Sequence, residues 1–537
     1  MWDHYRRSLY RAPEVGMTLD FSRVGFTSDY LAGMAGSVAS AADAMEALES
    51  GALANATENR MVGHYWLRAP DLAPTEDIRR AIEREIVAVE RFARDVRYGT
   101  FRGADGAFEH IIHVGIGGSA LGPQLVCDAL GDDRGLPQVH FLDNGDPAGV
   151  DRLLRRLDGE LGRTLVSIVS KSGWTPTPMQ VLRELQHAYE QASLNFGQHV
   201  VATTMPRTAL DQRAAEEGWQ ACFRIWPWVG GRTSVTSVVG LLPAALLGVD
   251  IRAFLQGAAQ VDELTRRRDP MRNPAMILAL AWHRLSRGKG EKNMVILPYK
   301  DRLSLFPRYV QQLVMESVGK KVNRRGEIVH QGFTVYGNKG STDQHAYVQQ
   351  LRDGPANFFA TFIHVEHDRV GPSCEVAPGL TLEDYLFGHL EGTRNAFYER
   401  GRESITISLR RLDPSSLGAL IALYERAVGL YAEFIDVNAY DQPGVDKDAA
   451  SEVVELQRLA MTHLRSSPNP QSVEEIATAI QRRGEEETLY KILTRLAIDP
   501  RRGVLRMGDS EALDGEGDVT WFQSSYDPLE NFRESAS

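Results

Sequence analysis

The sequence predicts an α/β protein in which two units, each built on a parallel sheet between helices, follow one another along the chain. From residue 110, short apolar strands alternate with glycine-bearing loops and helical stretches, and the same rhythm starts again after residue 290. Buried strands that alternate with helices are typical of parallel sheets covered on both faces. At 537 residues the chain also exceeds what one hydrophobic core organises, so two or more domains are expected.

The element boundaries follow from apolar patterning and turn residues. The first unit has expected strands at 111–114, 138–142, 165–169 and 200–204, and the second at 294–298, 333–337 and 358–365. We expect a helical N-terminal segment over 1–100, the first unit with its connecting helices over 101–288, the second unit over 289–440, a helical segment over 441–507, and a flexible acidic tail over 508–537.

Two further segments carry mixed signals. Residues 55–68 combine charged and large apolar side chains, which favours a helix packed against polar groups, and structural ion pairing is the commoner reason for such a mixture. Residues 473–506 suggest a helix pair followed by a basic wing, for which a packing appendage is the simpler interpretation.

Composition and charge exclude several classes of protein. A net charge of −11 and a pI near 5.8 argue against a nucleic-acid binder, which needs a basic face. The three cysteines stand far apart and match no metal-ligand spacing, so neither a metal nor a disulfide framework is expected. No long apolar stretch or leader-like N-terminus is visible, which predicts a cytoplasmic protein without a membrane segment.

Two glycine- and hydroxyl-bearing loops are candidate anion sites. The loop from Gly115 through Gly117, Gly118 and Ser119 follows a strand and opens a helix, which formally fits a dinucleotide site, and Asp143 ends the next strand, where a ribose hydroxyl would bind. A later loop, SKSGWT over 170–175, gathers three hydroxyls before a helix, as a terminal phosphate requires. N-capping of the helix is the structural alternative for those hydroxyls.

Candidate acid–base groups lie further along the chain. Glu316 and Gln312 are one turn apart on a largely apolar helix expected over 304–318, where a partly desolvated carboxylate could act as a base. The alternative is a surface glutamate paired with Lys320 or Lys321. Arg232 follows a glycine pair and could face a developing negative charge, although such loops are more often turns with an exposed arginine.

His345 closes a dense polar loop that follows the expected strand 333–337. Loops at the carboxyl ends of strands gather ligand sites in α/β sheets, so its imidazole could pass a proton to or from a sugar oxygen. A structural role is the usual one for a single histidine.

Taken together, these motifs resemble the phosphoglucose isomerase family over roughly residues 10–460. The matching segments occur in the family's order: NATENRMVGHYWLR, GIGGSALGP, SKSGWTP, GGRTSVTSVVGLLP, QQLVMESVGK, GNKGSTDQHAY and QPGVDK. The resemblance implies two tandem sugar-isomerase (SIS-like) αβα sandwich units, a homodimer, and reversible conversion of glucose 6-phosphate to fructose 6-phosphate in glycolysis and gluconeogenesis, without a cofactor.

The resemblance also implies a role for each candidate residue. Glu316 would be the base that moves a proton between C1 and C2, Arg232 would stabilise the enediolate, and His345, contributed across the dimer interface, would open the ring with help from a lysine. The remaining candidates would bind the substrate: Gly117, Gly118, Ser119, Ser170, Lys171, Ser172, Thr175 and Gln312.

Two departures from the family pattern leave alternatives open. The C-terminal signature is two residues shorter than the usual QPGVEAGK, so Lys447 either fills the lysine's role or leaves it vacant, and Trp174 stands beside the phosphate loop in place of a small residue. A catalytically silent sugar-phosphate-binding protein on the same fold is therefore the second hypothesis. A dinucleotide oxidoreductase, suggested by the first glycine loop alone, is the third. Whether mannose 6-phosphate is accepted depends on pocket details beyond these motifs.

Overall fold

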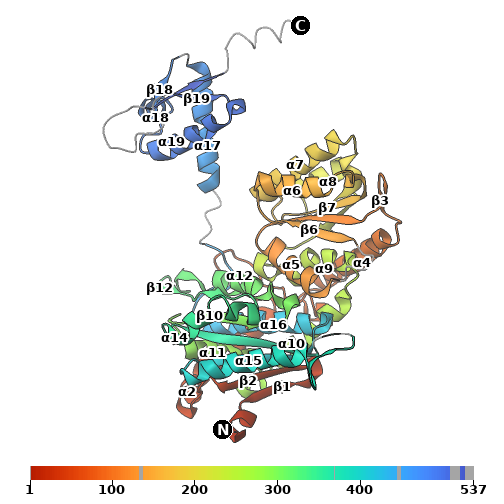
Figure 1. Cartoon of the computed structure of the whole chain (residues 1–537), viewed down its shortest axis with the longest axis vertical. Helices are drawn as coiled ribbons and strands as arrows, with labels where there is room; N and C mark the ends of the chain where they lie inside the picture. Colours follow the sequence, from red (N-terminus) through yellow and green to blue (C-terminus); the bar gives the residue numbers. More distant parts are fainter. Residues whose placement is uncertain are drawn as a thin grey trace. The chain divides into compact units, whose positions relative to one another are not determined.

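The computed structural model describes residues 2–131, 137–367, 369, 371–443, 449–467, 469–507 and 520–525. The chain divides into two compact units, Met1–Gln442 and Pro443–Ser537. Both predicted parallel sheets belong to the first unit (Figure 1), which confirms the predicted α/β fold. Among the helices of the described residues, none is long and apolar enough to cross a membrane.

The first sheet is wholly parallel, with strand order β6-β5-β7-β8-β9. Its strands are β5 (His110–Val114), β6 (Gln138–Leu142), β7 (Thr164–Val169), β8 (Val200–Thr204) and β9 (Ala221–Arg224), of which only β9 was not expected. Apolar side chains of α6 (Pro147–Arg156), α7 (Pro176–Gln191) and α8 (Ala209–Glu216) pack on one face. The other face packs against α4 (Glu76–Arg97), α5 (Gly118–Leu130) and α9 (Val238–Leu246), so the layers are helix, sheet and helix.

The second sheet has the order β1-β2-β17-β14-β10-β13. Strands β10 (Asn293–Pro298), β13 (Val335–Tyr336), β14 (Phe358–His367) and β17 (Ser404–Arg411) are parallel, whereas β2 (Met17–Arg23) runs antiparallel to β17 and β1 (Leu9–Ala12) antiparallel to β2. The segment 1–100, which was expected to be helical, therefore also contributes two strands to this sheet. Every residue of β2 is buried or half-buried, so the strand covers the edge of β17 that would otherwise be open.

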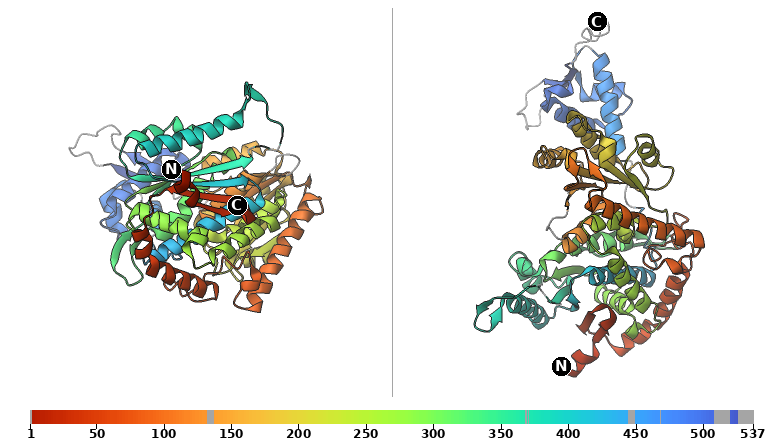
Figure 2. Two further views of the ribbon diagram at one scale, coloured as in Figure 1. Left: turned by 90° about the horizontal axis from the view of Figure 1, so that it is seen from below. Right: turned by 90° about the vertical axis from the view of Figure 1, so that its right-hand side faces the viewer.

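Helices cover both faces of the second sheet (Figure 2). On one face, α15 (Leu382–Glu399) and α14 (Val348–Asp353) bury Leu390, Phe397 and Leu351 against β10 and β14. On the other face lies the main core, which includes α10 (Ile251–Thr265), α11 (Pro274–Ser286), α12 (Phe306–Val318) and α16 (Pro414–Phe434). Helix α16 is buried around almost its whole circumference, as its apolar sequence requires.

Residues 55–68 form turns, not the expected helix. Asn55 and Arg60 close a small bridge, and Asn59 has a φ of 50°, which interrupts any helix. The charged residues of this segment do make structural ion pairs: Arg68 is fully buried and donates to Asp262 on α10 and to Glu425 on α16. This segment therefore ties two core helices together.

In its described residues, the second unit contains three α-helices and a three-stranded antiparallel sheet. The helices are α17 (Ala449–Ser466), α18 (Val473–Ala479) and α19 (Glu486–Ile498), and the sheet order is β18 (Gln471–Ser472), β20 (Trp521–Ser524), β19 (Val504–Met507). This is the topology of a winged helix. Strand β20 lies within the segment expected to be a flexible tail, so that prediction was wrong for these residues.

The basic residues of the expected wing, Arg501, Arg502 and Arg506, lie in β19 and in the short turn of helix just before it. Residues 508–519, which connect β19 to β20, lie outside the described residues, and their sequence holds five acidic residues and no lysine or arginine: Asp509, Glu511, Asp514, Glu516 and Asp518.

Candidate active site

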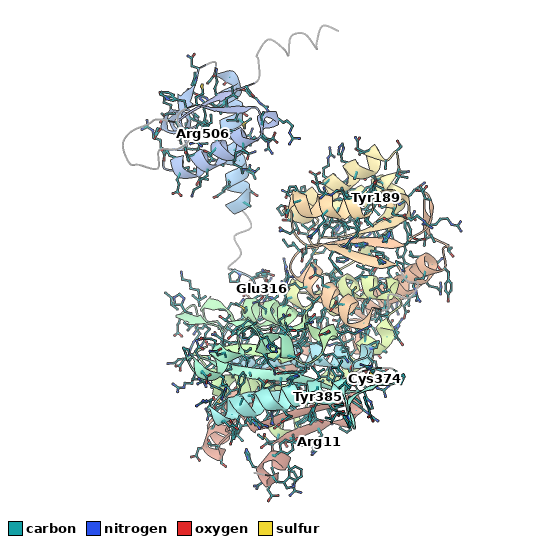
Figure 3. All side chains as sticks on the ribbon, viewed as in Figure 1. Arg11, Tyr189, Glu316, Cys374, Tyr385 and Arg506 are labelled. Atoms are coloured by element: carbon teal, nitrogen blue, oxygen red, sulfur yellow. The ribbon has the colours of Figure 1, made fainter. Side chains whose placement is uncertain are left out.

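Glu316 lies in the last turn of α12, next to α5 of the first sheet's helical layer (Figure 3). Its Oε2 atom accepts a hydrogen bond from Arg232 Nε at 3.0 Å, and its Oε1 atom accepts from Gln312 Nε2 at 3.1 Å. The side chain of Glu316 is 27% exposed, so one part of the carboxylate contacts the protein and the other part is accessible from outside. The alternative of a surface pair with lysine is wrong for Lys320, which pairs with Asp441 instead.

Arg232 is buried in the short 3-10 helix Gly231–Thr236, with a side chain only 7% exposed. Besides Glu316, its guanidinium donates from Nη1 to the carbonyl of Ala439 at 2.8 Å and from Nη2 to the carbonyl of Asp441 at 3.0 Å. Burial lowers the pKa of Arg232 from its usual value, and the nearby Glu316 carboxylate opposes that shift. The arginine is therefore a fixed, desolvated positive charge beside the carboxylate, and the alternative of an exposed turn residue was wrong.

The first glycine loop packs directly on the Arg232 loop and on α12. Gly117 has a φ of 58°, and a Cβ there would lie 3.1 Å from Gln312 Nε2. A Cβ on Gly118 would lie 1.9 Å from the carbonyl oxygen of Gly231. Only glycine permits this approach, so the glycine loop lies against both Gln312 and the Arg232 loop.

The same packing bears on the dinucleotide alternative. Asp143, the residue proposed to read a ribose hydroxyl, accepts a hydrogen bond from Gln124 Nε2 at 2.9 Å and lies 3.6 Å from Arg308. A pyrophosphate in a dinucleotide fold needs the space directly over the glycine loop. Here the main chain of the Arg232 loop stands against Gly118, which disfavours that binding mode.

Replacing Gly118 with alanine is expected to lower kcat/KM for the isomerisation that the family resemblance implies by roughly 10-fold or more. The reason is that the added methyl group pushes the start of α5 away from the Arg232 loop. The overpacking should also cost about 1–3 kcal/mol of unfolding free energy. Steady-state kinetics and urea denaturation measure the two effects. The matched control is Gly36→Ala on α3 (Ala35–Glu49), where a Cβ meets open space; a Gly118→Ala enzyme as active as this control would contradict the prediction.

The hydroxyl loop 170–175 follows β7 and precedes α7. Ser170 is buried and its Oγ donates to Thr175 Oγ1 at 3.0 Å, while Ser172 Oγ accepts from the Trp174 amide at 3.3 Å. Thr175 is the N-cap residue of α7, yet its side chain makes no capping hydrogen bond to the helix. Capping therefore does not account for these hydroxyls, although Pro176 and Pro178 leave the helix start with fewer free amides than a typical phosphate cradle.

Lys171 joins the hydroxyl loop to the Arg232 loop. Its Nζ donates to the carbonyls of Val229 at 2.6 Å and Pro227 at 2.9 Å, just before Gly230. Because β5 and β7 are adjacent and parallel, both glycine and hydroxyl loops leave the same edge of the sheet. Trp174 is 72% exposed, so the indole projects away from the folded unit.

Among the described residues, no hydrogen bond connects His345 with Glu316. It is the C-cap of α13 (Gly340–Gln344), and its side chain is exposed. Its neighbours are firmly held: Asp343 Oδ2 accepts the Asn338 amide at 3.0 Å, and Gln344 Nε2 donates to Tyr299 Oη at 2.9 Å. The loop thus presents the imidazole outward from an anchored base.

Three residues near the carboxylate were missed as site residues. Gln442 Nε2 donates to Glu316 Oε1 at 3.3 Å, and Lys320 and Asp441 form a buried ion pair behind Arg232. The signal was available for Gln442, which begins the QPGVDK signature. Lys447, expected in that signature, lies outside the described residues.

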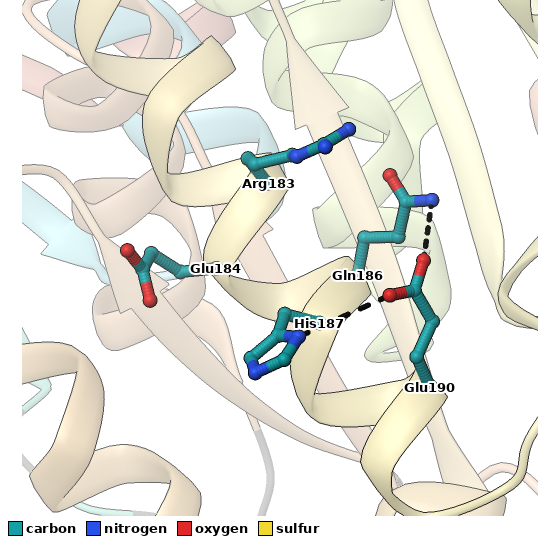
Figure 4. A pocket seen from close by; sticks show the side chains of 5 residues that line it. All are labelled: Arg183, Glu184, Gln186, His187 and Glu190. Carbon is teal, nitrogen blue, oxygen red and sulfur yellow. Dashed lines mark hydrogen bonds and ion pairs between the residues drawn. The ribbon is translucent and has the colours of Figure 1, made fainter. Parts of the chain in front are cut away.

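Other surface features do not add to this constellation. The exposed face of α7 carries Arg183, Glu184, Gln186, His187 and Glu190, of which Gln186 and His187 each contact Glu190 (Figure 4). Within the described ranges, no group of three or more His, Cys, Asp or Glu side chains could hold a metal ion.

Known proteins resemble this chain in sequence and in fold. The family model for phosphoglucose isomerase matches residues 20–372 and 389–469. A glucose-6-phosphate isomerase of Nostoc punctiforme is 50% identical over 95% of this chain and 97% of its own length, and one of Synechococcus sp. (strain JA-3-3Ab) is 53% identical over 95% and 96%. Among solved structures, a glucose-6-phosphate isomerase from Chlamydia trachomatis superposes with a TM-score of 0.77 at 25% identity, covering 85% of this chain and 92% of that one.

Proposed function

Because the chain belongs to the phosphoglucose isomerase family, we propose that it is a glucose-6-phosphate isomerase that interconverts glucose 6-phosphate and fructose 6-phosphate through a cis-enediolate. The observation that carries the proposal is the Glu316 carboxylate, held between Arg232 and Gln312 at the carboxyl edge of the first sheet. The carboxylate, the buried guanidinium and the glycine loop packed against the Arg232 loop support this proposal.

The proposed chemistry uses the carboxylate as a proton carrier. Moving an aldehyde from C1 to a ketone at C2 requires removing a weakly acidic carbon proton and returning it to the neighbouring carbon. Hydrogen bonds from Gln312 and Gln442 to Oε1 orient the carboxylate and leave Oε2 beside Arg232. One carboxylate can then serve both carbons in turn.

Arg232 would stabilise the negative charge that develops on the enediolate oxygens. A guanidinium cannot lose its proton in the working pH range, and burial keeps it poorly hydrated, so its electrostatic effect on a nearby oxyanion is large. The phosphate would be held by Ser170, Ser172, Thr175 and the Lys171 main chain, and the sugar would lie along Gly117, Gly118 and Ser119.

Proton NMR of fructose 6-phosphate in D₂O tests the function. The expected result is the appearance of glucose 6-phosphate carrying deuterium at C2, because the base exchanges its proton with solvent while the enediolate persists. Binding of fructose 6-phosphate without product or isotope uptake would instead establish the silent sugar-phosphate binder. That second function is favoured by the shortened signature at Lys447 and by Trp174.

We place His345 and a two-fold homodimer in the same proposal. The exposed imidazole on an anchored loop suits a residue that completes the site of a second copy. Lys447 would assist His345 in opening the ring. The substrates are small hexose phosphates, and the protein would act in the cytoplasm without nucleic acid, a membrane or a cofactor.

Mixing two inactive variants tests this shared site. If His345 acts across the interface, dimers formed from His345→Ala and Glu316→Gln subunits contain one intact site, and an equal mixture refolded together should recover about a quarter of wild-type activity. Each variant refolded alone serves as the control. A mixture no more active than its parents would show that each subunit uses its own histidine.

A further inference from the structure

A buried ion pair lies directly behind Arg232, at a position for which the proposed reaction gives no role. Lys320 follows α12, four residues after Glu316, and its side chain is only 5% exposed. Its Nζ donates to Asp441 Oδ1 at 2.7 Å and to the main-chain carbonyl of Asp441 at 2.8 Å. Burying a lysine is costly unless its charge is paired and its hydrogens are bonded, so this arrangement needs a reason.

The carbonyl of Asp441 is shared by the two buried cations. Arg232 Nη2 donates to it at 3.0 Å, and Lys320 Nζ donates to it at 2.8 Å. Arg232 Nη1 meanwhile contacts the carbonyl of Ala439, two residues earlier. The orientation of the guanidinium, and with it the direction of the Nε that faces Glu316, therefore depends on where segment 438–442 lies.

That segment is held from both sides. Asp441 Oδ2 accepts a hydrogen bond from Thr57 Oγ1 at 2.7 Å, and Asn438 Nδ2 donates to the same Thr57 oxygen at 3.1 Å. Lys320 anchors the other carboxylate oxygen. The next residue, Gln442, reaches Glu316 Oε1 at 3.3 Å. Lys320 thus fixes the main chain that carries the carbonyl bound by Arg232 and the Gln442 side chain bound to Glu316.

We propose that Lys320 and Asp441 are positioning residues. Acting through Arg232 and Gln442, they fix the distance and orientation between the guanidinium that stabilises the enediolate and the Glu316 carboxylate. The two residues touch no reacting atom. Their effect is on the geometry of the transition state, and it rests on the proposed function of Glu316 and Arg232. Burial lowers the pKa of Lys320, and the hydrogen bond to Asp441 opposes that shift.

The test compares Lys320→Met, Asp441→Asn and the double variant in the full-length protein. A misplaced guanidinium should lower kcat roughly 10- to 100-fold and leave KM for fructose 6-phosphate within about threefold. Because the two residues act as one unit, the double variant should lose little more activity than either single variant. Lys320→Arg, which keeps the charge, should recover part of kcat. Lys321→Met, at the exposed neighbouring lysine, is the matched control and should match wild type.

A second measurement separates positioning from simple loss of fold. The inhibition constant for 5-phosphoarabinonate, whose carboxylate mimics the enediolate, should rise in Lys320→Met in parallel with the fall in kcat/KM, while inorganic phosphate should inhibit as it does in wild type. Wild-type activity in Lys320→Met and Asp441→Asn, or equal weakening of both inhibitors, would overturn the proposal. An inactive wild type would instead overturn the proposed function itself.

Discussion

Replacing Glu316 with glutamine is expected to lower kcat about 10³- to 10⁴-fold, with KM for fructose 6-phosphate changed only a few-fold. The amide keeps the shape of the carboxylate and can still accept from Arg232, but it cannot take a proton from carbon. Because the interaction lost is the proton transfer itself, the effect falls on kcat. A coupled assay that follows formation of glucose 6-phosphate, run beside deuterium uptake at C2, measures both the overall rate and the step concerned.

The matched control for this substitution is Glu399→Gln, which makes the same chemical change at an exposed carboxylate near the end of α15. Its kcat should equal that of wild type. Unfolding curves should show Glu316→Gln to be folded, since the carboxylate is partly exposed and its partners remain. Retention of more than about a tenth of kcat would remove Glu316 from the role of base.

The parts of the site that sequence could predict are those fixed by local pattern. The loops after β5 and β7 follow apolar strands, and the parallel topology then places both at one edge of the sheet. Gln312 and Glu316 are one turn apart on a helix, so their hydrogen bond follows from spacing alone. These relations follow from the periodicity of helices and strands in the sequence and from its turn residues.

The parts that sequence missed depend on contacts between distant segments. The pairing of Lys320 with Asp441 joins residues 121 positions apart, and nothing in either neighbourhood marks them as partners. Strands β1 and β2 were missed because they complete a sheet whose other strands come nearly 300 residues later. Residues 55–68 read as a helix because their mixed composition fits one, whereas Arg68 is placed by Asp262 and Glu425 in the core.

Arg232→Lys is the second substitution with a large expected effect, a loss of roughly 10²- to 10³-fold in kcat even though the charge is kept. The guanidinium donates at the same time to Glu316, Ala439 and Asp441, and a single ammonium cannot reach all three. A buried carbonyl left without a donor should also cost about 1–3 kcal/mol of unfolding free energy. Steady-state kinetics and denaturant titration report the two losses separately. Arg252→Lys is the control, since that arginine pairs with Glu90 at the exposed surface of α10.

The origin of the kinetic loss can be tested by chemical rescue. If the missing element is a planar donor aimed at the enediolate, Arg232→Ala should regain activity when millimolar guanidine is added, because the small cation can occupy the vacated space beside Glu316. Ammonium should rescue less well, since it lacks the paired geometry. Glu316→Gln should gain nothing from either cation, as it lacks the base. Equal rescue by ammonium and guanidine would show that charge alone is needed, and the contacts to Ala439 and Asp441 would then serve only to hold segment 438–442 in place.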